Sequence, residues 1–283
     1  MKQRVITGLV IAAVIVPSVF LMFRVPLILV VLLSALSGAA IWEILRAVGC
    51  KNQILTYATA ALGAVVPFLV HYRVAVPFTV VAVIAGICFL TLMVVMHEKT
   101  TFADTVTALF CLAAVPGAFS CLLRLRDMYL SHPGFYERKN GWFFVMFTFL
   151  AAWGTDIFAQ LTGRKLGKHK LCPKISPKKS VEGAVGGVIG AIVLTMILFV
   201  IYDRFVFDTH ALKWYHVLIV TLFLSVVSMF GDLSASIIKR NHGVKDFGKI
   251  LPGHGGIMDR FDSMLFVIPA LWAMVELIAM IEG

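Results

Sequence analysis

Charged side chains are scarce in this chain of 283 residues, where Asp, Glu, Lys and Arg together make up only 14%. Acidic residues are the scarcer kind, since 15 Asp and Glu stand against 25 Lys and Arg. Hydrophobic residues make up 60% of the chain, and the mean hydropathy is +0.94. A soluble domain of this length does not need so much apolar sequence. The composition therefore indicates a polytopic membrane protein.

Cysteine is also sparse, with five scattered residues and no pair in CxxC spacing. This excludes a disulfide framework and a cysteine-based zinc site. No Walker A motif and no kinase glycine-rich loop is present, so P-loop and protein-kinase chemistry are not indicated. We find no internal repeat and no soluble domain, and we expect no nucleic-acid partner. The apolar run after Arg4 lacks a small-residue cleavage site, which favours a first transmembrane helix over a secretory signal.

Long apolar runs are abundant instead. A transmembrane helix needs about 20 mostly apolar residues, and these runs lack the polar–apolar alternation of barrel strands. The predicted fold class is all-α, a polytopic integral membrane protein with about nine transmembrane helices. We expect residues 1–140 to hold about five of them and a catalytic region, 141–283, about four, within one integrated domain. The predicted spans are 5–23, 26–45, 54–72, 74–96, 104–123, 141–160, 183–202, 214–238 and 262–281.

Nine spans put the two termini on opposite sides of the membrane, so the connectors can be sorted by their content of Lys and Arg. Of the 25 cations, 17 fall on the side of the N-terminus and 8 on the other side. The positive-inside rule then predicts that the N-terminus and both basic loops lie in the cytoplasm. We expect the protein to be integral to the cytoplasmic (inner) membrane, with its active site at the cytoplasmic face. The connector 124–140 is the weak point, because it holds four of the eight outside cations.

The first basic loop follows Asp156, near the cytoplasmic end of the sixth predicted span. Its glycines let backbone N–H groups approach an anion, and its cations and hydroxyls supply further donors. We expect Ser180 to cap the next helix, whose N-terminus would then offer free amides to a phosphate. The alternative is a loop that only orients the chain or touches anionic lipid headgroups. The candidate phosphate-binding residues here are Arg164, Lys168, Lys170, Ser176, Lys178, Lys179 and Ser180.

The second basic loop grows out of the eighth predicted span. Asp232 and Ser236 are four residues apart and share one helix face, and Lys239 and Arg240 follow one turn later. An acidic residue inside a membrane span indicates function by default, because a lone charge there is costly. The alternative is that Asp232 pairs with a nearby Lys or Arg only to orient helices.

A glycine-rich turn and an acidic segment complete this loop. His254 stands among glycines and is either a phosphate ligand or a turn residue. Asp259 and Asp262 are three residues apart at the predicted start of the last helix, where one of them could serve only as a cap. The candidate substrate-binding residues here are Lys245, His254, Gly255, Gly256 and Arg260.

Three carboxylates, those of Asp156, Asp232 and Asp259, approach the cytoplasmic face from three predicted spans. Oxygen ligands without cysteine favour Mg²⁺ over zinc. Such a metal would clamp the phosphates of a nucleotide for in-line displacement, while Lys and Arg neutralise the leaving group. Asp246 and Asp262 are further candidate ligands.

The run from Ser236 through Lys239-Arg240, Lys245-Asp246, Gly248, Leu251-Pro252 and His254-Gly255-Gly256 to Asp259-Arg260-Phe261-Asp262 resembles the signature of the phosphatidate cytidylyltransferases, or CDP-diacylglycerol synthases. The upstream block from Gly163 to Gly183 is similar to a second block of that family. The resemblance implies that CTP and phosphatidate react to give CDP-diacylglycerol and pyrophosphate. It also implies Mg²⁺ as cofactor, with K⁺ as a candidate second cation, and membrane lipids as surroundings.

The resemblance further implies that Asp232 and Asp259 ligate metal beside Ser236, and that Lys239, Arg240 and the pair Lys178–Lys179 bind phosphate. A CTP-dependent polyprenol or other lipid kinase is the alternative within enzymes, and an ion-coupled transporter is the alternative outside them. The first five spans either wall the pocket or form a homodimer contact.

Overall fold

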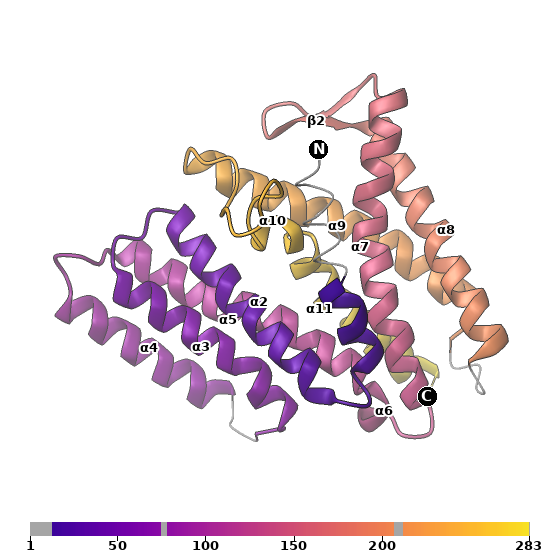
Figure 1. The fold of residues 1–283 in the computed structure, drawn as a ribbon, viewed down its shortest axis with the longest axis horizontal. Coiled ribbons are helices and arrows are strands. Elements are labelled where there is room, and N and C mark those ends of the chain that lie inside the picture. The colour runs from indigo at the N-terminus through magenta and orange to yellow at the C-terminus, as the bar shows by residue number, and fades with distance from the viewer. Residues whose placement is uncertain (1–12, 75–77, 207–211, 283) are drawn as a thin grey trace. The chain divides into compact units, whose positions relative to one another are not determined.

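The computed structural model describes residues 13–74, 78–206 and 212–282, with side chains from residue 83 onward in the second range (Figure 1). In this part of the chain, seven helical segments are long and apolar enough to cross a membrane. This confirms the predicted all-α polytopic membrane architecture. Residues 5–12 of the first predicted span and 75–77 of the fourth lie outside the described residues, so the count of nine stays a prediction. The seven segments are Pro26–Ala47, Gln53–His71, Phe102–Arg126, Arg138–Leu166, Val181–Phe205, Trp214–Asn241 and Met258–Glu282.

The contacts divide the chain into two compact units. Unit 1 comprises Met1–Leu123 and Ile238–Phe261, and unit 2 comprises Arg124–Ile237 and Asp262–Gly283. Both are discontinuous, because residues 238–261, which make up most of the signature segment, cluster with the N-terminal part of the chain. The predicted roles of 1–140 and 141–283 concern function and stay predictions.

Unit 1 contains α2 (Pro26–Ala47), α3 (Gln53–His71), α4 (Phe78–Val95), most of α5 (Phe102–Arg126) and the short α10 (Met258–Phe261). Pro26 at the first turn of α2 presets the helical backbone without losing a hydrogen bond. Asn52 caps α3 by accepting the N–H groups of Ile54 and Leu55, and it donates to Thr100 at 2.6 Å before α5. α2 and α3 pack along much of their length (Figure 1).

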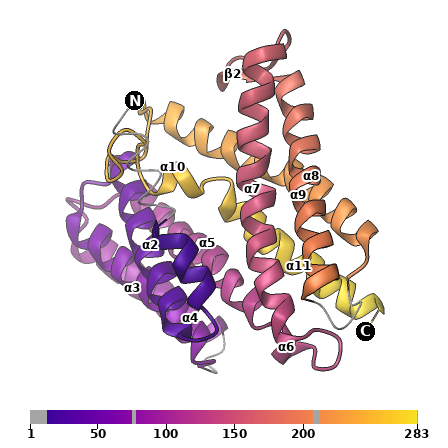
Figure 2. The ribbon, with the colours of Figure 1, turned by 45° about the vertical axis from the view of Figure 1, so that its right-hand side comes forward.

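Unit 2 contains α6 (Met128–Ser131), α7 (Arg138–Leu166), α8 (Val181–Phe205), most of α9 (Trp214–Asn241) and α11 (Met264–Glu282). A hairpin of β1 (Lys170–Cys172) and β2 (Ser176–Ser180) joins α7 to α8 (Figure 2). Its strands are antiparallel and pair Lys170 with Ser180 and Cys172 with Ser176. The sequence pattern predicted a loop here, and the two strands were not predicted.

In unit 2, α7 and α8 pack closely through a seam of glycines on α8. Gly183, Gly187 and Gly190 are buried and repeat at helical spacing, so they line one face. A Cβ added at Gly187 would lie 2.7 Å from the carbonyl oxygen of Thr155 on α7. Small residues allow such backbone approach, and this close packing drives helix association in lipid.

The start of the last predicted helix differs from the expectation. Asp259 lies in the one-turn helix α10, and the chain then breaks before α11 begins at Met264. Asp262 accepts the N–H of Ser263 at 2.8 Å in that break. The two carboxylates therefore belong to separate local structures, because their partners lie in different segments of the chain.

Candidate active site

Asp259, a predicted site residue in unit 1, is hydrogen-bonded through both of its carboxylate oxygens. Its Oδ1 accepts from Nζ of Lys239 at 2.8 Å, and its Oδ2 accepts from the N–H groups of Phe247 at 2.8 Å and Gly256 at 2.9 Å. The side chain of Asp259 is only 3% exposed. A buried charge is tolerated when it is paired and hydrogen-bonded in this way. Asp259 therefore closes the loop of residues 247–256 onto the end of α9.

The segment between α9 and α10 folds back through tight turns. Gly253 and Gly255 have φ of 77° and 87°, a left-handed backbone that glycine adopts without cost. Leu251 and Gly255 form an isolated antiparallel bridge, in which the Leu251 N–H donates to the Gly255 carbonyl at 2.9 Å. His254 is half-buried in this turn, and its Nδ1 has no hydrogen-bond partner among the described residues.

Glu43 of α2 also belongs to this cluster, although it was not among the predicted site residues. Its side chain is fully buried, and its Oε2 accepts the N–H of Met258 at 2.9 Å. The signal was available, because Glu43 is the one acidic residue inside the apolar helix Pro26–Ala47. An acidic residue within a membrane span has to be accounted for, but its partner is 215 residues away in the sequence.

In unit 2, Asp232 of α9 pairs with Lys179 of strand β2. The distance from Nζ of Lys179 to Oδ2 of Asp232 is 2.5 Å. The side chain of Asp232 is 28% exposed and that of Lys179 is 24% exposed. This contact joins the first basic loop to the intramembrane aspartate within one unit. Asp232 thus pairs with a lysine, as in the alternative in which such a pair only orients helices. However, this lysine lies in the polar hairpin and not on another apolar helix.

Asp156 of α7 lies in the same unit and accepts a hydrogen bond from Oγ of Ser263 at 3.1 Å. Gly231, next to Asp232, approaches the same segment, since a Cβ there would lie 3.0 Å from Cα of Ser263. α7, α9 and the start of α11 thus bring two predicted carboxylates to one region of unit 2. Sequence reasoning missed Ser263.

Two residues at the start of α8, Ser180 and Glu182, fix the hairpin. Ser180 is the N-cap, and its Oγ accepts the N–H of Gly183 at 3.1 Å, which confirms the predicted cap. Glu182 accepts the N–H groups of Lys168 at 3.1 Å and His169 at 3.2 Å. Its Oε1 also lies 2.6 Å from Nδ1 of His169. The loop's backbone amides at 168–169 are therefore already bonded to the protein.

The remaining predicted residues lie mostly at the surface. In the part of the chain that the structure describes, no group of three His, Cys, Asp or Glu side chains could hold a metal ion by itself. Unit 1 holds Lys239, Arg240, Lys245, Asp246, His254, Gly255, Gly256, Asp259 and Arg260. Unit 2 holds Asp156, Arg164, Lys168, Lys170, Ser176, Lys178, Lys179, Ser180, Asp232, Ser236 and Asp262.

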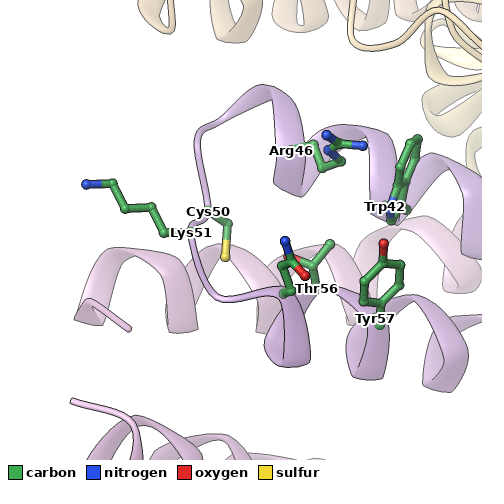
Figure 3. Close-up of a pocket in the computed structure, with 7 residues that line it drawn as sticks. Trp42, Arg46, Cys50, Lys51, Thr56 and Tyr57 are labelled. Atoms are coloured by element: carbon green, nitrogen blue, oxygen red, sulfur yellow. The ribbon is translucent and has the colours of Figure 1, made fainter. Parts of the chain in front are cut away.

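A small cavity of about 200 Å³ opens at the turn between α2 and α3 in unit 1 (Figure 3). The guanidinium of Arg46 lies 4.7 Å from the ring centre of Trp42, a cation–π distance. The other lining residues are Cys50, Lys51, Gln53, Thr56 and Tyr57. Aromatic and basic side chains are typical of a membrane–water interface, which is a sufficient account of this cavity.

The family model of the cytidylyltransferases matches residues 2–278. The chain belongs to the cytidylyltransferase family. It is 31% identical over 285 residues to the phosphatidate cytidylyltransferase of Bacillus subtilis, covering 98% of both chains. It is 34% identical over 272 residues to that of Staphylococcus aureus strain COL, covering 96% of this chain and 97% of the relative. With the Staphylococcus epidermidis relative it shares 40% identity over 152 residues, which is 53% of this chain and 56% of that one.

Family membership confirms the resemblance that rests on Ser236–Asp262. The match covers both units, so the helices of residues 1–140 belong to the family as much as the signature does. The chain is accordingly a membrane-embedded nucleotidyltransferase.

Proposed function

We propose that this protein transfers the cytidylyl group of CTP to phosphatidate, which yields CDP-diacylglycerol and pyrophosphate for phospholipid synthesis. The observation that carries the proposal is the family match over residues 2–278, with full-length relatives named phosphatidate cytidylyltransferase. The clusters around Asp259 and Asp232 supply buried and half-buried charges of the kind that phosphate chemistry uses.

The reaction needs positioning more than acid–base catalysis. A phosphate monoester is already mostly dianionic near pH 7, so an oxygen of phosphatidate can attack the α-phosphorus of CTP without a base. The new bond joins the phosphatidate oxygen to the α-phosphorus. As it forms, the bond between the α-phosphorus and the oxygen that bridges to the β-phosphorus breaks, and the electron pair leaves with pyrophosphate. The main barrier is the approach of two polyanions, which fixed cations and alignment lower.

Among the described residues, Lys179 and Lys239 each lie against a carboxylate of the predicted site. Each lies within 2.8 Å of an aspartate oxygen, so each ammonium group has a defined position. We propose that they neutralise phosphate oxygens, with Lys178 and Arg240 as further phosphate binders at exposed positions. A lysine ammonium has three donors, so it can bond a carboxylate and a phosphate together.

The carboxylates fit Mg²⁺ by their donor chemistry. Mg²⁺ in nucleotide-handling sites commonly takes one or two carboxylates, with waters and substrate phosphates completing its shell. Among the described residues Asp259 Oδ1 accepts from a single donor, Lys239, and Asp232 is partly exposed, so both carboxylates can still offer an oxygen. We propose Asp232 and Asp259 as the ligands, with Asp156, Asp246 and Asp262 as further candidates and K⁺ as a second cation. When bound, the metal supplies charge neutralisation on the triphosphate.

The orientation in the membrane follows from the charge distribution. We propose that the site faces the cytoplasm in the inner membrane, because 17 of the 25 Lys and Arg fall on the predicted N-terminal side. CTP would then arrive from the cytoplasm and phosphatidate from the leaflet. A homodimer contact through the first five spans stays a prediction.

The decisive experiment follows the label of CTP into the lipid. Purified protein in phosphatidate-containing detergent micelles receives Mg²⁺ and CTP labelled with ³²P at either the α- or the γ-position. We expect the α-label in a chloroform-soluble lipid and the γ-label only in pyrophosphate. Asp232→Asn and Asp259→Asn should each lower turnover by at least about 100-fold, since each removes charge stabilisation at the reacting phosphates.

Transfer of the γ-label to a lipid alcohol would instead identify a CTP-dependent lipid kinase. Absence of any labelled lipid, combined with ion movement in liposomes, would identify a transporter. Turnover at the wild-type rate in both folded Asn variants would contradict the metal-ligand assignment, but it would not affect the assignment of CTP and phosphatidate as substrates.

A further inference from the structure

Glu43 is a buried acid in a part of unit 1 that the proposed reaction does not otherwise use. It lies in the last two turns of α2, and its exposed fraction is 0%. Its Oε2 accepts the Met258 N–H at 2.9 Å, while its Oε1 has no hydrogen-bond partner among the described residues. Burying a carboxylate with an unbonded oxygen costs free energy. A purely structural α2 would be more stable with an apolar residue there.

Two glycines of the signature segment are shaped around this carboxylate. A Cβ added at Gly248 or Gly256 would overlap the carboxylate of Glu43, and the three nearest atoms belong to the Glu43 side chain in both cases. Neither glycine has the positive φ that would itself require glycine. The requirement at both positions is therefore space for Glu43, and not backbone freedom.

The contacts of Glu43 surround the loop that holds Asp259. Met258, which donates to Glu43, directly precedes Asp259, and Gly256 touches Glu43 while donating its N–H to Asp259 at 2.9 Å. α10 also packs against α2 within unit 1 (Figure 1). The position of the Asp259 carboxylate thus depends on a loop that Glu43 fills and bonds from the other side.

We propose that Glu43 is a positioning residue for the cytidylyl transfer, which sets the loop 247–258 so that Phe247 and Gly256 hold Asp259 in place. This rests on the proposed role of Asp259. It gives α2, in the N-terminal half of the chain, a defined part in the site. Glu43 touches no reacting atom; it acts through Met258 and the two glycines.

The first test separates positioning from general stability. Glu43→Ala should lower kcat at least about 30-fold in protein that keeps its thermal midpoint within a few degrees. Glu43→Gln keeps the volume and one acceptor for Met258, so it should restore most of that loss. Leu33→Ala removes a similarly buried side chain from α2, away from the loop. It should lower the thermal midpoint and leave the kcat of the folded protein near the wild-type value.

The second test uses the overlap with glycine. Gly248→Ala should reduce kcat at least about 10-fold in the wild-type background, and have less than a 2-fold further effect in the Glu43→Ala background, because the obstructing atoms are gone. Independent, multiplicative effects of the two substitutions would overturn the proposal. So would a fall in kcat for Leu33→Ala that matches Glu43→Ala.

A readout without substrate or metal keeps the two proposals apart. Amide hydrogen exchange of a peptide covering 247–258 should be at least about 5-fold faster in Glu43→Ala than in wild type, and close to wild type in Glu43→Gln. Unchanged exchange in Glu43→Ala would overturn the positioning role whatever Asp259 does. If Asp259→Asn keeps full turnover while this exchange still responds to Glu43, the assignment of Asp259 fails and the link between Glu43 and the loop stands.

Discussion

Lys178 and Lys179 are neighbours on strand β2 but have different surroundings. Successive side chains of a strand point to opposite faces. Lys179 reaches Asp232, at 2.5 Å, whereas Lys178 is exposed. An ion pair that is about a quarter exposed contributes little stability. The contact is therefore better explained by the chemistry of the site than by the strength of the fold.

This difference predicts unequal effects of two adjacent substitutions. Lys179→Ala should lower kcat/KM for CTP by about 100-fold, the scale for losing one charge-stabilising donor, without lowering the thermal midpoint. Lys178→Ala, the matched control, should cost less than about 10-fold and act mainly on KM. Steady-state kinetics in phosphatidate micelles would measure both. Equal losses of kcat/KM in the two variants would contradict a specific role for Lys179 and indicate that the hairpin acts only as a general cationic surface.

At the scale of elements, α7 and α8 depend on close backbone contact. Gly187→Ala should therefore destabilise the protein by about 1–3 kcal/mol, the usual cost of overpacking, because the Thr155 carbonyl is part of a helix and cannot move aside. Gly117→Ala in α5 is the control, since no atom lies within 4 Å of the added Cβ. Thermal unfolding in detergent should show a midpoint several degrees lower for Gly187→Ala alone. Similar midpoints in both variants would contradict the packing role.

Some elements were predictable from the sequence and others were not. Apolar runs located the seven spanning segments, because length and hydropathy decide that a helix can cross a bilayer. The Ser180 cap was predictable because it depends on a residue three positions away. The hairpin and the break before α11 were missed, because polar backbone turns leave no periodic signal. The contact of Glu43 with Met258 was beyond reach, since only tertiary folding joins them.

At the scale of the whole molecule, the orientation in the membrane is the open prediction, and its weakest part can be tested directly. In a cysteine-free variant, Lys174→Cys in the exposed hairpin turn should react with an impermeant maleimide only in inside-out vesicles. Ser131→Cys, exposed at the end of α6, should react only from the opposite side. Labelling of both cysteines from the same side would mean that the chain crosses the membrane an even number of times between positions 131 and 174. This would contradict the single span predicted there, 141–160.

The units give the whole molecule a division that linear reading did not suggest. Predicted site residues fall into both, and each unit neutralises its own aspartate with its own lysine, Lys239 for Asp259 and Lys179 for Asp232. The sequence showed which residue types gather and the family supplied the substrates. Only the structure shows which lysine pairs with which aspartate. Lys239 and Asp259 are 20 positions apart and Lys179 and Asp232 are 53 positions apart, so local sequence spacing does not predict either pair.

The glycine seam of α8 also limits how this helix can vary. Its outward positions, such as Val185, Ile189 and Val193, are about half exposed, so they can exchange among apolar residues freely. At Gly183 and Gly187 a single added carbon meets backbone oxygen within 2.8 Å. Saturation mutagenesis of α8 should therefore separate two kinds of position. Outward-facing positions should tolerate many apolar residues, and the seam positions should tolerate almost only glycine.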